Sequence, residues 1–245
     1  MKYYGHSLYH IRGDKGVDSH RGFVLNNLAK ALSDMGRNSI TVCLDGLKLR
    51  RNLAEEVPLA VSYNTLALIY DDMDRYEDAP ELAAKAIAYL RRAGAERSLA
   101  MALQQLGESL RHLAIRTQRG EKVQATPDSL YAASETLLRE ARRIFVKTGE
   151  VSRLIMVLIE LGSLYRDRLR PHSGSNDAPT RQRETDYREA ISNLSEAMKM
   201  ARENQLKHLE VDASVNLAWT HFHAGKYAET ERSSKSLNIS FQSLT

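Results

Sequence analysis

Residues 57–92, with the sequence VPLAVSYNTLALIYDDMDRYEDAPELAAKAIAYLRR, decide the fold. Apolar and small residues recur at three- and four-residue intervals on both sides of a polar segment, first as Leu59, Tyr63, Leu66, Ala67 and Tyr70 and then as Leu82, Ala83, Ala86, Ile87 and Leu90. This spacing places each set on one face of an α-helix. The polar segment 71–75 predicts a tight turn, so the stretch predicts two antiparallel helices that form a hairpin.

The first half of this hairpin is repeated along the chain. A five-residue phrase ends in Leu followed by Ala or Gly, and a residue that is usually Leu or Tyr follows three positions later. It occurs at Leu25–Ala29, Tyr63–Ala67, Leu103–Gly107, Leu158–Gly162 and Ser214–Ala218. A small residue one helical turn from a large one allows a second helix to approach closely. Strand patterns are nearly absent, so the repetition predicts an all-α protein built from helical hairpins.

These phrases resemble helix A of the tetratricopeptide repeat, in which a Leu-Gly pair is followed three residues later by an aromatic residue. The second halves resemble helix B of that repeat at Tyr76–Ala79, Leu138–Ala141, Tyr187–Ala190 and Lys226–Thr230. The first repeat departs from the pattern at Asn38–Thr41, and the closing proline of the family is not matched. The resemblance implies a right-handed superhelical solenoid of about five hairpins with two loop insertions.

The small residues of the phrase are 38, 40, 55 and 56 residues apart, which is longer than the period of about 34 residues of the short form. We therefore expect inserted loops in the third and fourth repeats, with lengthened helices before the insertion as the alternative in the third. The predicted organisation is an N-terminal helix at 1–16 that caps or remains from an earlier repeat, repeat 1 at 17–52, repeat 2 at 53–94, repeat 3 at 95–149 with an insertion at 114–127, repeat 4 at 150–206 with an insertion at 168–185, and repeat 5 with a C-terminal segment at 207–245.

The composition is that of a folded protein stabilised by packing. The chain has 245 residues, of which 42% are hydrophobic, and a single cysteine, Cys43, which forms no internal disulfide and is interpreted as core filling. No run of about 18 apolar residues is present. The first residues also lack the apolar stretch of a signal peptide, so the expected location is the cytoplasm.

No arrangement of residues predicts catalysis. No glycine-rich loop ends in the Gly-Lys-Ser/Thr sequence that binds nucleotide phosphates. The close pairs His6 with His10 and His221 with His223 have no accompanying carboxylate at ligand spacing. We therefore predict a protein that is not an enzyme, with no cofactor and no metal site.

The remaining candidates lie on the surface that the repeat register assigns to the concave side of the first helices. They are Asn26, Lys30, Asn64, Gln104, Glu108, Arg111, Ser163, Arg166 and Trp219. The amides of Asn26, Asn64 and Gln104 would hydrogen-bond an extended peptide backbone, unless they are ordinary exposed helix residues. Arg111 and Arg166 would bind one carboxylate or phosphate, unless Glu108 and Asp167 neutralise them. Trp219 either packs in the interior or anchors a partner.

Positive charge is concentrated in the middle of the chain, where residues 111–183 contain fourteen basic and eight acidic residues. The two expected insertions would bring a basic edge together, made of Arg116, Arg119, Lys122, Arg168, Arg170, Arg181 and Arg183. Positive charges clustered in this way repel one another unless acidic groups lie nearby and compensate them. We expect this edge to dock an acidic surface of a partner or of a domain outside this chain, with two solvated loops as the alternative.

The functional prediction is a scaffold that binds a protein or peptide. The phrase Leu25–Ala29 and the helix end Ala201–Gln205 resemble the sensor arms of STAND-type, maltose-regulator-like signalling ATPases of bacteria, and also the repeats attached to caspase-like proteases. The resemblance implies a sensor or regulatory role in a larger signalling protein. The alternative is a helical-repeat module that binds nucleic acid through the Arg-rich edge, although few aromatic residues are available there for base stacking. A third interpretation is an enzyme whose site is not recognisable.

Overall fold

The computed structural model describes residues 15–233 except 54, 122, 124 and 171–179. The predicted N-terminal helix at 1–16, apart from its last two residues, and the predicted C-terminal segment after residue 233 lie outside these residues. The helices are α2 (Lys15–Asp34), α3 (Ile40–Asn52), α4 (Glu56–Asp72), α5 (Ala79–Arg92), α6 (Glu96–Gln118), α7 (Pro127–Thr148), α8 (Val151–Arg168), α9 (Thr180–Glu203) and α10 (Lys207–His223). Residues 227–233 are also helical. No strand occurs among the described residues, and the all-α prediction is confirmed.

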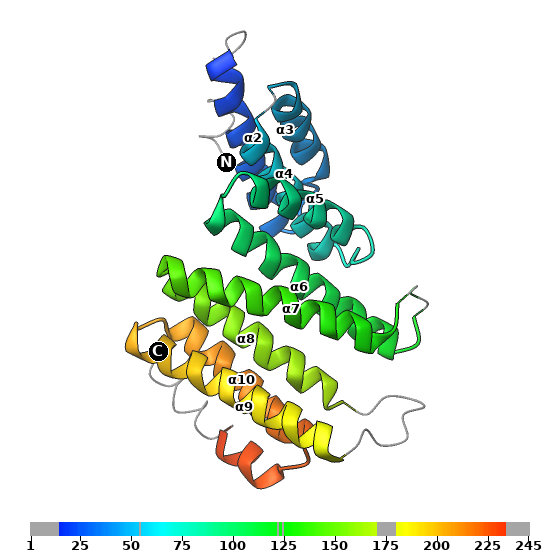
Figure 1. Cartoon of the computed structure of the whole chain (residues 1–245), viewed down its shortest axis with the longest axis vertical. Helices are drawn as coiled ribbons and strands as arrows, with labels where there is room; N and C mark the ends of the chain where they lie inside the picture. The colour runs from blue at the N-terminus through cyan, green and yellow to red at the C-terminus, as the bar shows by residue number, and fades with distance from the viewer. Residues whose placement is uncertain (1–14, 54, 122, 124, 171–179, 234–245) are drawn as a thin grey trace. The chain divides into compact units, whose positions relative to one another are not determined.

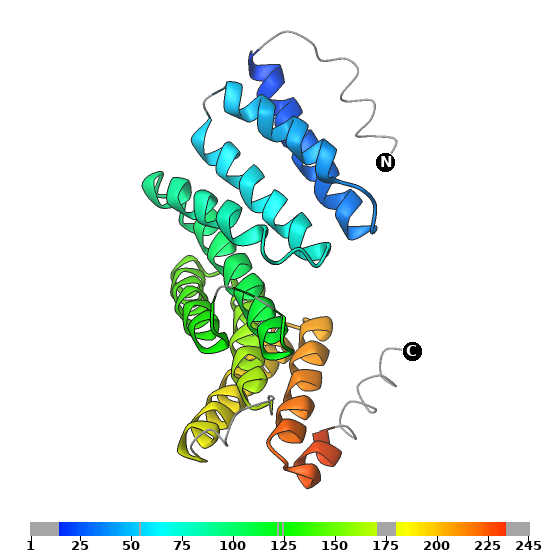
Figure 2. The ribbon, with the colours of Figure 1, turned by 90° about the vertical axis from the view of Figure 1, so that its right-hand side faces the viewer.

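The chain divides into two compact units, residues 1–110 and 111–245. In the first unit, α2 packs against α3 and α4 against α5, and the four helices lie side by side as two antiparallel hairpins (Figures 1 and 2). In the second unit, α8 packs against α7, α9 and α10 (Figure 1). Helical hairpins are thus the building blocks of both units.

The small residues of the repeated phrase are buried where helices meet. Ala29 and Ala67 in the first unit are fully buried. In the second unit a Cβ atom on Gly162 would overlap the side chain of Leu194 on α9. Helices α8 and α9 therefore approach closely at Gly162 because glycine has no side chain. Cys43 is fully buried, as expected of core filling, and burial raises the pKa of its thiol to about 12.

The third and fourth repeats have shorter non-helical connections than the sequence analysis predicts. Helix α6 continues to Gln118, so residues 114–118 of the expected insertion are helical. Its apolar face continues as well, because Leu113 and Ala114 are buried. Helix α7 begins at Pro127, where the side chain of Thr126 accepts a hydrogen bond from the backbone of Ser129. Most of the extra length of this repeat is therefore in the helices, which have 23 and 22 residues.

The second expected insertion, at 168–185, is also shorter in the structure than the sequence analysis predicts. Helix α8 ends at Arg168 and α9 begins at Thr180, so residues 180–185 are helical. Residues 171–179 lie outside the described part of the chain. A similar correction applies to the predicted turn at 71–75, since α4 includes Asp71 and Asp72.

Candidate functional site

Three amide side chains occupy equivalent positions in neighbouring helices of the first unit. Asn26 on α2 and Gln104 on α6 are each only 6% exposed, and Asn64 on α4 is partly buried. The side-chain oxygen of each has no hydrogen-bond partner among the described residues. A buried oxygen without a donor costs about 1–3 kcal/mol. We call Asn26, Asn64 and Gln104 the amide row. Lys30 and Glu108 lie one turn further along two of these helices, Lys30 exposed and Glu108 half-buried.

Polar contacts hold the helices of the amide row together. Ser33 on α2 donates a hydrogen bond to Asp72 on α4 at 2.6 Å. The carboxylate of Asp71 accepts hydrogen bonds from the Gln105 amide at 2.6 Å and from the Ser109 hydroxyl, both on α6. The three helices of the row are thereby linked in the order α2, α4, α6.

Asp71 is a buried carboxyl group that the sequence analysis assigned to a turn. Burial raises its pKa from 3.8 to about 6, and Asp72 adds to this increase, while the hydrogen bonds from Ser109 and Gln105 act against it. Its other oxygen has no hydrogen-bond partner among the described residues. The signal that could have located it is its register, because Asp71 follows Ala67 by four residues, as Arg111 follows Gly107.

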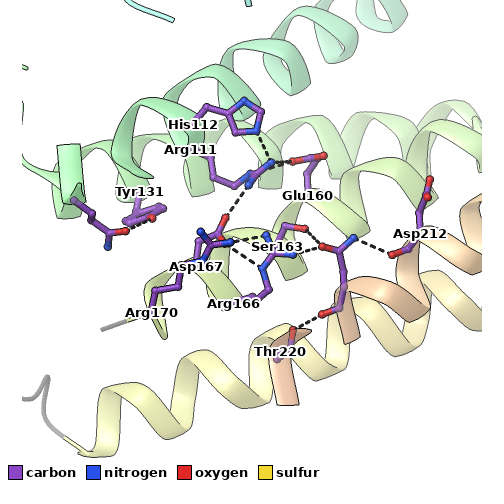
Figure 3. Close-up of polar contacts among 12 residues, drawn as sticks. Arg111, His112, Tyr131, Glu160, Ser163, Arg166, Asp167, Arg170, Asp212 and Thr220 are labelled. Atoms are coloured by element: carbon purple, nitrogen blue, oxygen red, sulfur yellow. Dashed lines mark hydrogen bonds and ion pairs between the residues drawn. The ribbon is translucent and has the colours of Figure 1, made fainter. Parts of the chain in front are cut away.

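Arg111 and Arg166 do converge on one carboxylate, but it belongs to this chain (Figure 3). Arg111 Nη1 lies 2.7 Å from Asp167 Oδ2, and Arg166 Nη2 lies 2.8 Å from Asp167 Oδ1. Arg170 Nη2 lies 3.1 Å from the same Oδ1 atom. Asp167 is fully buried, and burial by itself would raise its pKa, but the three guanidinium groups outweigh that effect and lower it.

Further internal contacts surround these ion pairs. Arg111 also pairs with Glu160 on α8 at 3.1 Å. Ser163 donates a hydrogen bond to the side-chain oxygen of Asn216 on α10 at 3.0 Å, and Arg166 donates to the same atom. The structure therefore places Arg111, Ser163 and Arg166 in a buried polar network between helices. Asp167, one of the two carboxylates that the alternative interpretation named, neutralises Arg111 and Arg166. Glu160, which the sequence analysis did not single out, is the other carboxylate at Arg111.

Several residues of the expected basic edge also have partners within the chain. Arg116 forms an ion pair with Glu121, and Arg170 is held by Asp167. Arg168 lies over the rings of Tyr131 and Tyr165, at 5.7 and 5.4 Å from their centroids, and pairs with Glu135 at 3.0 Å and with Asp186 at 3.6 Å. Arg119 and Arg181 are exposed and Arg183 is half-buried, whereas Lys122 lies outside the described residues.

Known proteins share this architecture. Residues 59–93 match the tetratricopeptide-repeat model. The fold is that of the TPR-like repeat proteins. The structure is similar to the crystal structure of BtubC (BKLC) from P. vanneervenii, with a TM-score of 0.72, 17% identity, and coverage of 99% of this chain and 87% of that one.

Two other similar structures are of TPR-like repeats. The "Podosopora anserina putative kinesin light chain nearly identical TPR-like repeats" give a TM-score of 0.66 at 14% identity, with 93% of this chain and 98% of that chain covered. A point-mutant form of the same repeats gives 0.65 at 15% identity, with 91% and 95% covered. No curated protein matches the sequence significantly.

The last TPR-like hairpin exposes a group of aromatic side chains. Trp219 is 51% exposed, Phe222 45% and Tyr227 67%. The ring centroids of Trp219 and Phe222 are 5.7 Å apart, those of Trp219 and His223 are 5.8 Å apart, and those of Phe222 and Tyr227 are 5.9 Å apart. We call these four residues the aromatic patch. The interpretation of Trp219 as an interior residue is wrong, because its indole lies half in solvent.

The described residues include no group of three or more His, Cys, Asp or Glu side chains placed to hold a metal ion. His221 forms a hydrogen bond with Tyr187, and His223 belongs to the aromatic patch. The pair His6 and His10 lies outside the described residues. Among the described helices, none has the length and hydropathy needed to cross a membrane.

Proposed function

We propose that the chain is a non-enzymatic scaffold that binds a protein segment in an extended conformation along the amide row. We further propose that it acts in the cytoplasm as the sensor or regulatory part of a larger bacterial signalling protein. The observation that carries the proposal is the repetition, in three successive first helices, of an amide whose side-chain oxygen is buried and has no hydrogen-bond partner in the described part of the chain, at Asn26, Asn64 and Gln104.

The chemistry of an amide suits a peptide backbone. Each side-chain amide has both a donor and an acceptor, as does each peptide unit. A donor from a ligand would satisfy the oxygen that the described residues leave without a partner. Packed helices lie about 8–10 Å apart, and an extended chain advances about 3.3 Å per residue. Three amides on neighbouring helices would therefore contact about every third residue of one bound segment.

The experiment is selection of a binding peptide from a displayed random library, followed by affinity measurements with the purified chain. We expect Asn64→Ala to weaken binding by about 2- to 13-fold, since a hydrogen bond contributes about 0.5–1.5 kcal/mol. Asn38→Ala is the matched control, because Asn38 is exposed and outside the row. N-methylation of the peptide at the contacting positions should reproduce the loss.

Two results would reject this proposal. One is that the library yields no peptide that binds. The other is that the triple variant Asn26→Ala, Asn64→Ala, Gln104→Ala binds the selected peptide as tightly as the unchanged chain. An assay for ATP hydrolysis is expected to show no turnover, and measurable turnover would contradict the non-enzymatic assignment.

The alternative function, nucleic-acid binding through the Arg-rich edge, has less support. Phosphate recognition requires several cations that are available to the ligand. Arg116, Arg168 and Arg170 instead engage carboxylates of the chain.

A further inference from the structure

A small pocket lies in the second unit, where the end of α8, the start of α9 and the turn after α10 meet. It has a volume of about 180 Å³ and is lined by Leu169, Arg183, Glu184, Tyr187, Ala224 and Lys226. Of these, the sequence analysis predicted a binding role only for Arg183, as part of the basic edge. Lys226 was outside that edge, and packing alone brings it to the same pocket.

The pocket has a positive balance of charge. Lys226 Nζ lies 3.9 Å from the centroid of the Tyr187 ring, and the Tyr187 hydroxyl is 3.0 Å from His221 Nδ1. Among the described lining residues the one carboxylate is Glu184, which lies 3.0 Å from Arg188. Two cations, Arg183 and Lys226, therefore line the pocket beside an acidic group that already has a partner. This arrangement favours a bound anion.

The aromatic patch adjoins this pocket along the chain. Tyr227 follows Lys226 directly, and the ring of Phe222 contacts that of Tyr227. Exposed, contiguous aromatic side chains are typical of protein interaction sites, and Trp and Tyr residues often carry most of the binding energy there. The arginines of the buried network also act electrostatically on His223 of the aromatic patch. Burial lowers the pKa of His223, and the positive charges of Arg170 and Arg166 lower it further.

We propose that the pocket and the aromatic patch together dock an acidic segment of a partner protein. A carboxylate of the segment binds between Arg183 and Lys226, and a neighbouring apolar side chain covers the aromatic patch. The occupant is a protein segment because the surface combines apolar area with two cations, whereas a nucleic-acid strand would need a longer row of them. The proposal does not depend on the amide row, which belongs to the other unit.

Trp219 provides a direct measurement, because it is the only tryptophan of the chain and lies in the patch. The probe is an acetylated peptide of alternating Glu and Leu residues without tryptophan, titrated into the full chain at low salt. We expect a saturable change in Trp219 fluorescence. The double variant Arg183→Glu, Lys226→Glu should weaken the interaction by about tenfold or more, because each substitution replaces attraction with repulsion. Lys199→Glu on α9 is the matched control, since the Lys199 side chain is 76% exposed.

The controls separate the alternatives. Circular dichroism verifies that the variants fold, and Arg183→Gln with Lys226→Gln repeats the test without adding negative charge. The triple variant of the amide row should leave this titration unchanged. An absent fluorescence change, or equal affinity of the double variant, would overturn the proposal. Stronger binding by a thymidine oligonucleotide than by the acidic peptide would also overturn it, and would assign the surface to nucleic acid.

Discussion

Arg111 on α6 and Asp167 on α8 lie 2.7 Å apart although 56 residues separate them in the sequence. Asp167 is fully buried and also forms ion pairs with Arg166 and Arg170. One carboxylate thus compensates several guanidinium groups inside the second unit. This network therefore holds helices together, and its removal should lower the free energy of unfolding.

Replacement of Asp167 by Asn should destabilise the chain by about 3–5 kcal/mol, because Arg166 would be left buried without its counter-charge and Arg111 would keep only Glu160. The measurement is urea denaturation followed by circular dichroism. Asp212→Asn, at an exposed position on α10, is the control and should change the free energy of unfolding by less than about 0.5 kcal/mol. A loss below about 1 kcal/mol for Asp167→Asn would show that the ion pairs are not as the structure places them.

The same residue should produce acid sensitivity. The pKa of Asp167 is lowered in the folded state. The stability that it contributes is therefore present above the pKa of an unfolded Asp, about 3.9, and is lost as the pH falls through the lower folded value. Unfolding curves recorded at decreasing pH should show this loss in the unchanged chain and lack it in Asp167→Asn.

Asp71 should have the opposite pH dependence. Its pKa is raised from 3.8 to about 6, so the folded state favours the protonated form, and stability should fall as the pH rises through this interval. Asp71→Asn removes the buried charge and should stabilise the chain at neutral pH by about 1–3 kcal/mol. Thermal melts at pH 4 and pH 7.5 test this expectation. Asp45→Asn, at an exposed position on α3, is the control, and an equal gain of Asp71→Asn at both pH values would contradict the assignment.

Arg168 tests whether part of the basic edge is structural. Its guanidinium lies over Tyr131 and Tyr165 and pairs with Glu135. Arg168→Lys should destabilise the second unit by about 1–2 kcal/mol, because an ammonium group is compact and cannot stack or pair in the same way. Arg188→Lys, at an exposed position on α9, should have little effect in the same denaturation experiment. Equal effects of the two substitutions would argue for a solvated Arg168.

Gly162→Ala tests the close approach of α8 and α9. The added methyl group would overlap Leu194, and we expect a loss of about 1–3 kcal/mol despite the better helix propensity of Ala. In the double variant with Leu194→Ala, the two changes should be strongly non-additive, because the smaller side chain makes room for the methyl group. A double-mutant cycle measures the coupling, and additive losses would exclude the contact.

Local periodicity was sufficient to predict the helical hairpins. The spacing of Leu59, Tyr63 and Leu66 depends only on the 3.6-residue turn of a helix, and the need for Ala67 or Gly162 at a helix contact follows from side-chain volume. The repetition of the phrase carried this prediction to both units. The positions of the amide row also followed from the register, which specifies a face of each helix.

Tertiary structure decided what each face contacts. Register placed Arg111 and Arg166 on related faces of their helices. Only the packing of the helices brings both guanidinium groups to the carboxylate of Asp167. The partners of a charge depend on distances in space, which no local sequence pattern specifies. Packing likewise left Trp219 half in solvent and brought Lys226 to the same pocket as Arg183. It also kept Ala114 buried on a longer α6, where the sequence suggested a loop, because continued burial of an apolar face stabilises a helix beyond its local signals.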